Sequence, residues 1–301
     1  MKIGELKSIV AVQDAGFKVT SAADSTHTSQ PGISRHVRNV ENELGVQLFE
    51  RHKNRLTGLT SAGKTIVPMI SNFLLQLDTI RNVALEFQSG YRGKVTVATS
   101  HTHARYLLPP IIRSFIQNNP FVELSLRQGH SEQITEWLHN GEADISVLSS
   151  PGKYDPSLSF RKIGEMHRVI LTSVDHPLLS ASKVCLEEVA RYPIITYSPE
   201  YAAHTQIMSA FEAFGLQPSV CLSAGDTDTI KTYVKFGMGV GIVASIAFDP
   251  ELDSDLRAMD ANTLFPPARI FLGTNINSTL STHSQRLVQL IEDNLSKHVT
   301  G

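Results

Sequence analysis

Residues 28–45 read TSQPGISRHVRNVENELG, and the pattern of this stretch predicts a short helix with one buried face. Apolar residues recur every three or four positions, which places them along one side of an α-helix; they are Ile33, Val37, Val40 and Leu44. The opposite side carries a hydroxyl group and long hydrogen-bond donors, contributed by Gln30, Ser34, Arg35 and Arg38. The stretch therefore predicts a helix that packs against a core and presents arginines outward.

The Pro and Gly near the beginning of this stretch mark the start of the helix. The Ser29 hydroxyl can accept a hydrogen bond from a free amide of the first turn, and Pro31 falls where a missing N–H costs nothing. Another helical segment comes before it, with the small residues Ala22 and Ala23 that allow close packing. Two helices joined by a tight turn, the second with a basic outer face, predict a helix-turn-helix.

The outer face of the second helix has the chemistry of a DNA-reading surface. In a helix-turn-helix the N-terminal part of this helix enters the major groove, where Gln and Arg can pair with base edges. The segment FERHKNRLTGLT (49–60) then predicts a β-ribbon with a basic tip, suited to a flanking phosphate or the minor groove. The alternative is a solvated helix face beside a surface hairpin. The expected DNA-binding residues are Thr28, Ser29, Gln30, Pro31, Ser34, Arg35, Arg38, Lys53 and Arg55.

The 301-residue chain is basic at one end and acidic over the rest. Residues 1–64 hold nine Lys and Arg against six Asp and Glu, whereas the whole chain holds 27 against 29, a formal net charge of −2. This asymmetry favours a polyanionic partner at the basic end. The cysteines Cys185 and Cys221 are too few for a disulfide framework, and no apolar run approaches the ~18 residues of a membrane span. We expect a soluble, cytoplasmic protein with no membrane partner.

These residues also carry a family resemblance. The stretch VTSAADSTHTSQPGISRHVRNVENELGVQLFER (19–51), followed by TGLTSAG (57–63), resembles the winged helix-turn-helix of LysR-type transcriptional regulators. The resemblance runs without a gap through about the first 64 residues. It implies an N-terminal, mainly α-helical winged helix-turn-helix over residues 1–59, whose partner is double-stranded promoter DNA.

Residues 60–87 predict one long helix with an apolar stripe. At 1.5 Å per residue, about 28 residues give a helix of about 42 Å. No neighbouring sequence would cover so long a stripe, which favours a seam between two chains over a core helix of a large domain. The resemblance implies a linker helix (60–89) that forms a homodimer through 60–87, with a homotetramer and RNA polymerase as further partners. The stripe consists of Ile66, Met69, Ile70, Phe73, Leu77, Ile80 and Ala84.

From about residue 90 the pattern changes to alternating strands and helices. Segments such as GKVTVATS (93–100) and ADISVLSS (143–150) bracket helical stretches, and a similar set follows in the second half. Such repeats predict parallel sheets, here in an α/β body of two lobes. The body resembles the type-2 periplasmic-binding-protein fold, which in this family binds small effectors between the lobes. The expected bounds are 90–301 for the effector-binding domain, with lobe I at 90–162 and 268–301, lobe II at 163–267, and crossovers near 160–167 and 264–270.

The segment SHTHARYLLPP (100–110) follows a predicted strand and opens a helix. Amides at a helix N-terminus lack partners and carry partial positive charge, so the nearby hydroxyls of Ser100 and Thr102 favour an anion pocket. Ser149 ends another predicted strand and would face the same pocket, because ligands in open α/β sheets bind at the carboxyl ends of strands. His101 and His103 form the H-x-H pattern of zinc sites, but no later His or Asp set completes a metal shell. A plain helix-capping segment is the other alternative.

The body also resembles one branch of the family, the cysteine-regulon activators of sulfur assimilation and sulfonate use. The resemblance is carried by ATSHTHARYLLPPII (98–112), GEADISVLSS (141–150) and DTDTIKTYVKFGMGVGIV (226–243). It implies a pocket for a sulfate-like group, and its contacts map onto Ser100, Thr102, His103, Ser149 and Ala202.

The sequence departs from this branch at two of the mapped positions. The branch has an amide side chain where His103 stands and a Thr where Ala202 stands. Thr205 is close enough in sequence to offer a hydroxyl in place of the one that Ala202 lacks. A protonated His103 would attract an anion, which predicts that effector affinity rises as the pH falls through the range where histidine titrates.

Together these patterns predict a sequence-specific DNA-binding regulator of sulfur assimilation or sulfonate utilisation. The expected effector is a small anion, either sulfate, adenosine phosphosulfate or acetylserine, and we expect no catalytic residues, metal or other cofactor. One alternative is a LysR-type regulator that responds to a different carboxylate or aromatic anion. An enzyme or solute-binding protein with the same body is the alternative from another class, although no nucleophile–base pair supports it.

Overall fold

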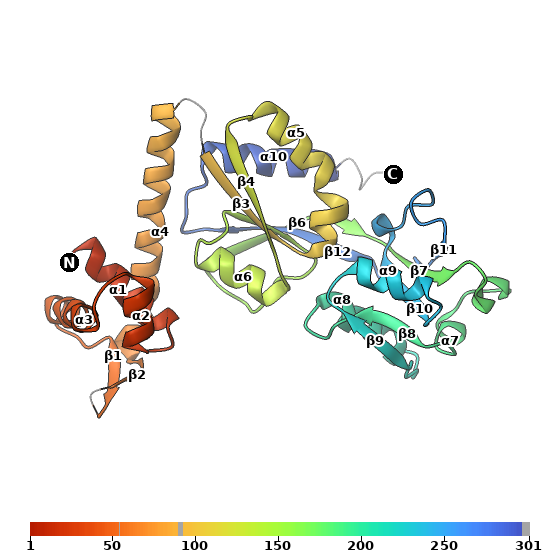
Figure 1. Cartoon of the computed structure of the whole chain (residues 1–301), viewed down its shortest axis with the longest axis horizontal. Coiled ribbons are helices and arrows are strands. Elements are labelled where there is room, and N and C mark those ends of the chain that lie inside the picture. The colour runs from red at the N-terminus through yellow and green to blue at the C-terminus, as the bar shows by residue number, and fades with distance from the viewer. Residues whose placement is uncertain (54, 90–92, 297–301) are drawn as a thin grey trace. The chain divides into compact units, whose positions relative to one another are not determined.

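The structure, a computed structural model, describes residues 1–53, 55–89 and 93–296. The predicted boundary at residue 90 and the end of the expected effector domain, 297–301, lie outside this range. The chain divides into two compact units, one built by residues 1–84 with the short segment 277–279, and the other chiefly by residues 85–276 and the C-terminal helix (Figure 1). No helix among the described residues is both long and apolar enough to span a membrane.

Three helices and a hairpin open the N-terminal unit. The helices are α1 (Ile3–Asp14), α2 (Val19–Ser25) and α3 (Gln30–Leu44), and the hairpin joins β1 (Phe49–His52) to β2 (Arg55–Leu59). The apolar face predicted for the second helix of the motif lies in the core of this unit, where Ile33, Val37 and Val40 are buried and Leu44 packs at the edge. The predicted winged helix-turn-helix is therefore confirmed.

Local chemistry fixes both ends of α3. The Gly32 N–H donates to Ser29 Oγ at 3.2 Å, and Pro31 occupies the first turn, as the sequence predicts. At the other end Gly45 has a φ of 70°, a left-handed conformation that glycine adopts without a steric penalty. The helix thus begins and ends where its cap residues allow.

A buried carboxylate ties α3 to the hairpin. Glu41 Oε1 accepts hydrogen bonds from the backbone N–H groups of Leu48 (2.8 Å) and Phe49 (3.2 Å), and Oε2 lies 2.6 Å from Arg51 Nη2. Hydrogen bonds to a charged carboxylate are strong, and because Glu41 is buried it cannot exchange them for hydrogen bonds to water. Glu41 therefore holds the base of the hairpin in a fixed orientation relative to α3.

The apolar stripe of the long helix α4 (Ser61–Ser89) is partly buried in the N-terminal unit and partly exposed to solvent. Val67 and Ile70 are buried in the core of the N-terminal unit, and Ile66 packs against it. Met69 and Phe73, in contrast, are 64% and 46% exposed, as is Ile80 at 64%. The prediction of one continuous intermolecular seam is thus wrong for Ile66 and Ile70, which their own chain covers. The exposed part of the stripe remains available to a partner.

The first lobe of the body is a five-stranded sheet in the order β4-β3-β5-β12-β6. Strands β3, β4 and β5 are parallel to one another, and β12 lies between β5 and β6, antiparallel to both. Helices α5 and α10 cover one face and α6 covers the other (Figure 1). The strands are β3 (Gly93–Thr99), β4 (Val122–Gln128), β5 (Ile145–Leu148), β6 (Leu158–Met166) and β12 (Ala268–Asn275), and the helices are the π-helical turn η1 (His103–Leu107), α5 (Pro109–Asn118), α6 (Ser131–His139) and α10 (Thr282–Ser296).

The second lobe repeats this plan with the strand order β11-β7-β10-β8-β9. Strand β8 is parallel to β9 and β10, whereas β7 is antiparallel to β10 and β11. The sequence predicted parallel sheets, but both sheets are mixed, because the segments that cross between lobes add antiparallel strands. The elements are β7 (Arg168–Ser173), η2 (Pro177–Ser180), α7 (Leu186–Val189), β8 (Ile194–Tyr197), α8 (Ala202–Glu212), β9 (Val220–Ala224), α9 (Thr227–Lys235), β10 (Val240–Ala244), η3 (Ser245–Ala247) and β11 (Leu256–Asp260).

The chain passes between the lobes twice. Strand β6 of the first lobe leads through His167 directly into β7 of the second, and the segment between β11 and β12 returns. The carboxyl ends of β3, β5 and β8, together with the start of β7, therefore contribute to the boundary between the two lobes.

Candidate functional site

The predicted DNA-reading face lies on the solvent side of α3. The side chains of Gln30, Arg35 and Arg38 are exposed, and Ser34 is half-buried beside them. The opposite face of α3 is anchored on α1, where Ser8 Oγ lies 2.8 Å from His36 Nδ1 and Asn39 Nδ2 donates to Glu5 Oε1 at 2.8 Å. The helix thus presents its donors outward from a fixed base, as major-groove reading requires.

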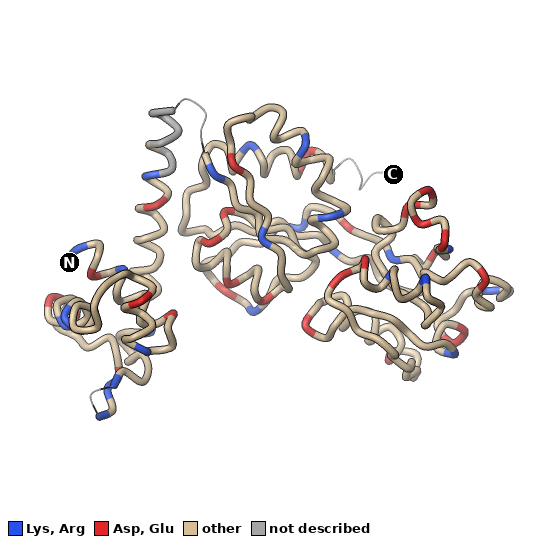
Figure 2. Tube along the Cα trace, in the orientation of Figure 1, with Lys and Arg blue, Asp and Glu red and all other residues tan. Residues whose placement is uncertain are grey.

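The hairpin adds a second basic element. Lys53 and Arg55 are exposed at its turn, and Lys53 has a positive φ of 46°. Figure 2 shows Lys and Arg residues gathered on the hairpin and on α3. The remaining predicted residues, Thr28, Ser29 and Pro31, lie at the N-terminus of α3. All nine predicted DNA-binding residues therefore lie on α3, the turn before it or the hairpin.

Two strand ends bring the predicted effector hydroxyls together. Parallel strands β3 and β5 are neighbours, with Thr99 opposite Val147, so Ser100 and Ser149 follow them at the same edge of the sheet. Both serines and Thr102 line a cavity of about 50 Å³ between the lobes. The sequence-based grouping of Ser100, Thr102 and Ser149 matches this geometry.

His103 lies behind these serines, outside the cavity lining. It is fully buried, its Nδ1 is 2.8 Å from Ser100 Oγ, and its Nε2 is 3.4 Å from Ser149 Oγ. A neutral imidazole has one donor and one acceptor nitrogen. One serine therefore gives its hydroxyl hydrogen to His103, and the other accepts from His103 and keeps its own hydrogen for a ligand.

The expectation that a charged His103 attracts the anion is wrong. Burial lowers the pKa of His103 from 6.5 to about 4, so the ring is neutral at physiological pH. His103 thus acts through the orientation of Ser100 and Ser149. The alternative of a zinc site has no support in the structure. Among the described residues, no group of three or more His, Cys, Asp or Glu is placed to hold a metal ion.

The second lobe supplies the opposite wall of the cavity. Ala202 lines it at the first turn of α8, but Thr205 is exposed and does not line it. The helix carries Thr205 to the solvent side, so this hydroxyl cannot replace the one that Ala202 lacks. The expectation for Thr205 is corrected accordingly.

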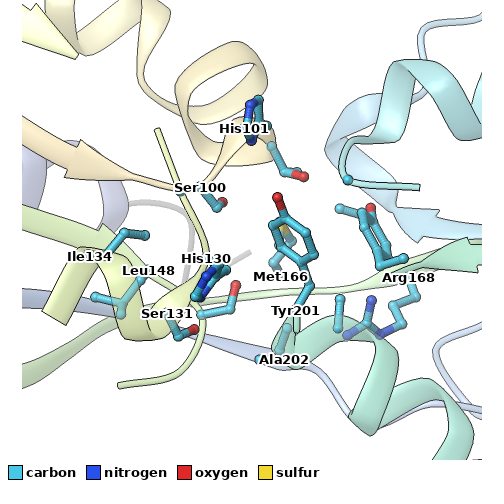
Figure 3. A pocket seen from close by; sticks show the side chains of 18 residues that line it. Ser100, His101, His130, Ser131, Ile134, Leu148, Met166, Arg168, Tyr201 and Ala202 are labelled. Atoms are coloured by element: carbon cyan, nitrogen blue, oxygen red, sulfur yellow. The ribbon is translucent and has the colours of Figure 1, made fainter. Parts of the chain in front are cut away.

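Several residues of the cavity were missed by the sequence-based reasoning. Tyr197, Tyr201 and Arg168 line it from the second lobe, and His130 from the first. Figure 3 shows Ser100 and Ser131 on one side and Arg168, Tyr201 and Ala202 on the other. The rings of His130 and Tyr201 meet edge to face across the lobes, with centroids 6.3 Å apart. The only signal in the sequence was a lone arginine at the start of the apolar strand RVILTS (168–173).

Hydrogen bonds link the two lobes beside the cavity. Thr102 Oγ1 is 3.1 Å from Thr227 Oγ1, which is 2.8 Å from the Tyr197 hydroxyl. One turn further on, the Tyr106 hydroxyl donates to Asp228 Oδ1 at 2.7 Å, and Arg105 Nε lies 2.8 Å from Asp228 Oδ2. A ligand that engages Thr102 therefore acts on a group that also joins the lobes.

The electrostatic character of the cavity favours an anion. Its lining, as far as the structure describes it, contains an arginine, two histidines and several hydroxyl groups but no Asp or Glu. The first turn of α8, which no side chain caps, adds the partial positive charge of a helix N-terminus. Such a set of donors without a competing carboxylate can hold a small oxyanion.

Comparison with known proteins agrees with both halves of this description. The model of the bacterial regulatory helix-turn-helix of the lysR family matches residues 3–64, and the model of the LysR substrate binding domain matches residues 88–296. The chain is 37% identical over 297 residues to the HTH-type transcriptional regulator SsuR of Burkholderia cenocepacia, with 99% of this chain and 96% of that protein covered.

Other relatives give the same result. The chain is 36% identical to the HTH-type transcriptional regulator CysB of Haemophilus influenzae, over 100% of this chain and 91% of that protein. Its fold matches the cofactor-binding domain of the Cbl transcriptional regulator with a TM-score of 0.63 and 35% identity, covering 70% of this chain and 95% of that one. All three are named regulators of transcription, not enzymes, and they confirm the resemblance stated from the sequence. The chain belongs to the LysR family of bacterial transcriptional regulators, in the branch that includes SsuR, CysB and Cbl.

Proposed function

We propose that this regulator controls genes of sulfur assimilation or sulfonate utilisation, and that a small sulfur oxyanion bound between its lobes governs its action on promoter DNA. The observation that carries the proposal is the cavity itself. Three hydroxyl-bearing residues, Ser100, Thr102 and Ser149, face a wall that contains an arginine, and no carboxylate lines the described part of the site. Kinship with SsuR, CysB and Cbl supports the sulfur assignment.

The size of the cavity favours sulfate among the three candidate effectors. One water needs roughly 10–15 Å³ of such space, so about 50 Å³ holds a few waters or one small anion. Adenosine phosphosulfate carries a nucleoside that this volume cannot contain with the lobes as they stand. An O-acetylated serine carries a positive amine, for which no carboxylate partner lines the described cavity. An N-acetylated serine has no positive amine, but its acetyl and hydroxymethyl groups make it larger than sulfate.

Effector binding reaches the DNA-binding unit, in this proposal, through the equilibrium between arrangements of the lobes. An anion at Thr102 competes with or strengthens the bond from Thr102 to Thr227, and it therefore changes the relative stability of those arrangements. A ligand shifts such an equilibrium only by its difference in affinity for the two states. The shared Thr102 hydroxyl provides such a difference.

A thermal-shift experiment on the full chain tests the effector. Sulfate at 100 times its dissociation constant should stabilise the protein by about 2.7 kcal/mol. Thr102→Ala and Ser149→Ala should abolish this stabilisation, since each removes a hydroxyl from the cavity while the lobe cores stay intact. Ser150→Ala is the matched control, because Ser150 is the next residue but does not line the cavity.

The ligand panel should include adenosine phosphosulfate, acetylserine and a set of carboxylates and aromatic acids. If only a carboxylate or aromatic acid raises the melting temperature, the chain is a LysR-type regulator of another pathway. The lack of a hydroxyl at Ala202, with Thr205 turned to solvent, is the observation that favours this second candidate.

DNA recognition gives a second expected result. Arg35→Ala or Gln30→Ala should weaken binding to the cognate promoter by about 1–3 kcal/mol and relax its sequence specificity, because these side chains lie on the exposed face of α3. Lys53→Ala should weaken binding to all sequences about equally, as loss of a phosphate contact does, and reduce the salt dependence. Anisotropy titrations with promoter and scrambled DNA at several salt concentrations measure both effects.

Lys7→Ala serves as the charge-matched control for these titrations. Lys7 is exposed on α1, away from the reading face of α3, so its loss should leave binding almost unchanged. Equal affinity of wild type and an Arg35→Ala/Arg38→Ala double variant for the promoter would contradict the assignment of α3 as the recognition helix.

The exposed part of α4 supports a homodimer. Promoter sites with two halves need two reading heads, and Met69, Phe73 and Ile80 offer an apolar surface that the described residues of the same chain leave exposed. We further propose that two such dimers form a homotetramer and that the regulator contacts RNA polymerase.

A further inference from the structure

Arg168 is a buried cation without an acidic partner. It opens β7, only 4% of it is exposed, and it lines the cavity between the lobes. Its Nη2 donates to Gln206 Oε1 at 2.7 Å, whereas its Nε has no hydrogen-bond partner. Among the described residues no carboxylate lies within ion-pair distance of this guanidinium.

This arrangement differs from that of another largely buried cation in the same lobe. Lys231 is 12% exposed and pairs with the buried Asp253 at 2.6 Å. Arg168 has only the neutral amide of Gln206, which satisfies one donor but cancels no charge. A buried charge without a counter-charge is costly, and a planar guanidinium has donors that match an oxyanion in pairs. An anion bound in the cavity beside Arg168 would supply the missing counter-charge.

We propose that Arg168 is the residue that reads the charge of the effector, by forming an ion pair with it from the second lobe. Ser100 and Ser149 hold the same anion from the first lobe, so the ligand contacts both walls. Figure 3 shows Ser100 and Arg168 on these two walls. The inference rests on the proposed function, and it narrows the ligand to a small oxyanion with full negative charge. Gln206 is then a positioning residue, because it orients the guanidinium from behind.

The neighbouring groups are consistent with this role. Tyr197 and Tyr201 line the cavity with neutral hydroxyls, and burial raises the pKa of both phenols further above physiological pH. On the adjacent strand, Ala244 pairs with Arg168 and adds no polar side chain. Within the described second-lobe lining, Arg168 is thus the side chain that carries a positive charge at every physiological pH.

Gln206→Glu tests the inference without removing the arginine. The new carboxylate would stand next to the guanidinium and supply the counter-charge internally. Sulfate affinity, measured by calorimetry on the full chain, should therefore fall by at least about 30-fold, the scale for loss of a buried charge pair. The melting temperature without sulfate should stay equal or rise. A purely structural role for Arg168 would change stability but leave sulfate affinity as it is.

Two further variants complete the design. Asn119→Asp makes the same amide-to-acid change beside another arginine, since Arg286 Nη1 donates to Asn119 Oδ1 at 3.3 Å, but it lies outside the cavity. It should leave sulfate affinity unchanged. Arg168→Lys keeps the charge but not the forked donors, so it should weaken sulfate binding by about 10-fold. It also gives an answer if Gln206→Glu does not fold.

The outcomes separate this inference from the sulfur assignment. If Gln206→Glu or Arg168→Lys binds sulfate like wild type, the role of Arg168 is refuted while the proposed function stands. If wild type binds a carboxylate instead of sulfate, and Gln206→Glu loses that ligand, Arg168 keeps its role and the sulfur assignment fails. If wild type binds no anion of the panel, both are refuted.

Discussion

Replacing Phe73 with Asp should convert the proposed homodimer of this regulator into a monomer and weaken its binding to paired DNA half-sites. Phe73 is 46% exposed on α4 and lies one turn from Met69, which is 64% exposed. In a helix-to-helix seam each new carboxylate would be buried without a partner, at a cost of about 3–5 kcal/mol. A symmetric dimer contains two copies, so its dissociation constant should rise by more than roughly 100-fold.

Light scattering measures the change in mass, and titration with one or two half-sites measures its effect on DNA binding. Asn72→Asp is the matched control, because it adds the same charge one residue away on a different side of the helix. Ile70→Asp is a contrasting variant: Ile70 is buried in the core of the N-terminal unit, so its substitution should unfold that unit. A Phe73→Asp protein that stays dimeric would show that the exposed stripe is not the seam.

The division of α4 shows what a linear pattern can predict. Spacing alone identified a long helix with one apolar side, and the structure has that helix. Spacing cannot tell whether an apolar side chain is covered by its own chain, because the cover comes from other parts of the N-terminal core, which are distant in sequence. Val67 and Ile70 therefore belong to a core, whereas Met69 and Phe73, on the same helix, remain exposed.

The effector cavity shows the same limit. Ser100 and Ser149 could be predicted because each follows a strand, and neighbouring parallel strands end at one edge. Arg168 could not, because it reaches the cavity from the start of an antiparallel strand in the other lobe. Its environment depends on how two sheets from different parts of the chain face each other, and local periodicity contains no information about that.

His103 was placed in the right segment but given the wrong environment. The pattern predicted a protonatable His103 beside the anion at a helix N-terminus, whereas the π-helical turn η1 directs His103 behind the serines, where it is fully buried. Burial disfavours the charged imidazolium, because the described surroundings offer hydroxyl groups but no carboxylate in contact with the ring. The titration of His103 is therefore linked to folding stability, and not to the affinity for the anion.

The free energy of unfolding should therefore fall as the pH decreases from 6.5 toward 4. In this window the unfolded chain binds a proton at His103, which has a pKa of about 6.5 when exposed, while the folded chain, with a pKa of about 4, does not. Excess protons on the unfolded state favour unfolding. The loss is about 1.4 kcal/mol per pH unit within the window, or roughly 3 kcal/mol over its full width.

Urea denaturation of wild type and His103→Gln at pH 7.5, 6.5, 5.5 and 4.5 measures this contribution. Gln keeps a donor and an acceptor for Ser100 and Ser149 but does not titrate. Burial also lowers the pKa of His176, so both proteins should lose stability in acid, and the difference between the two curves isolates His103. The stability of wild type minus that of the variant should be constant above pH 7. Below pH 6.5 this quantity should fall progressively, as wild type loses stability faster than the variant. Parallel curves throughout would mean that His103 has the same pKa in the folded and the unfolded chain, and that it is again a candidate for direct contact with the anion as an imidazolium.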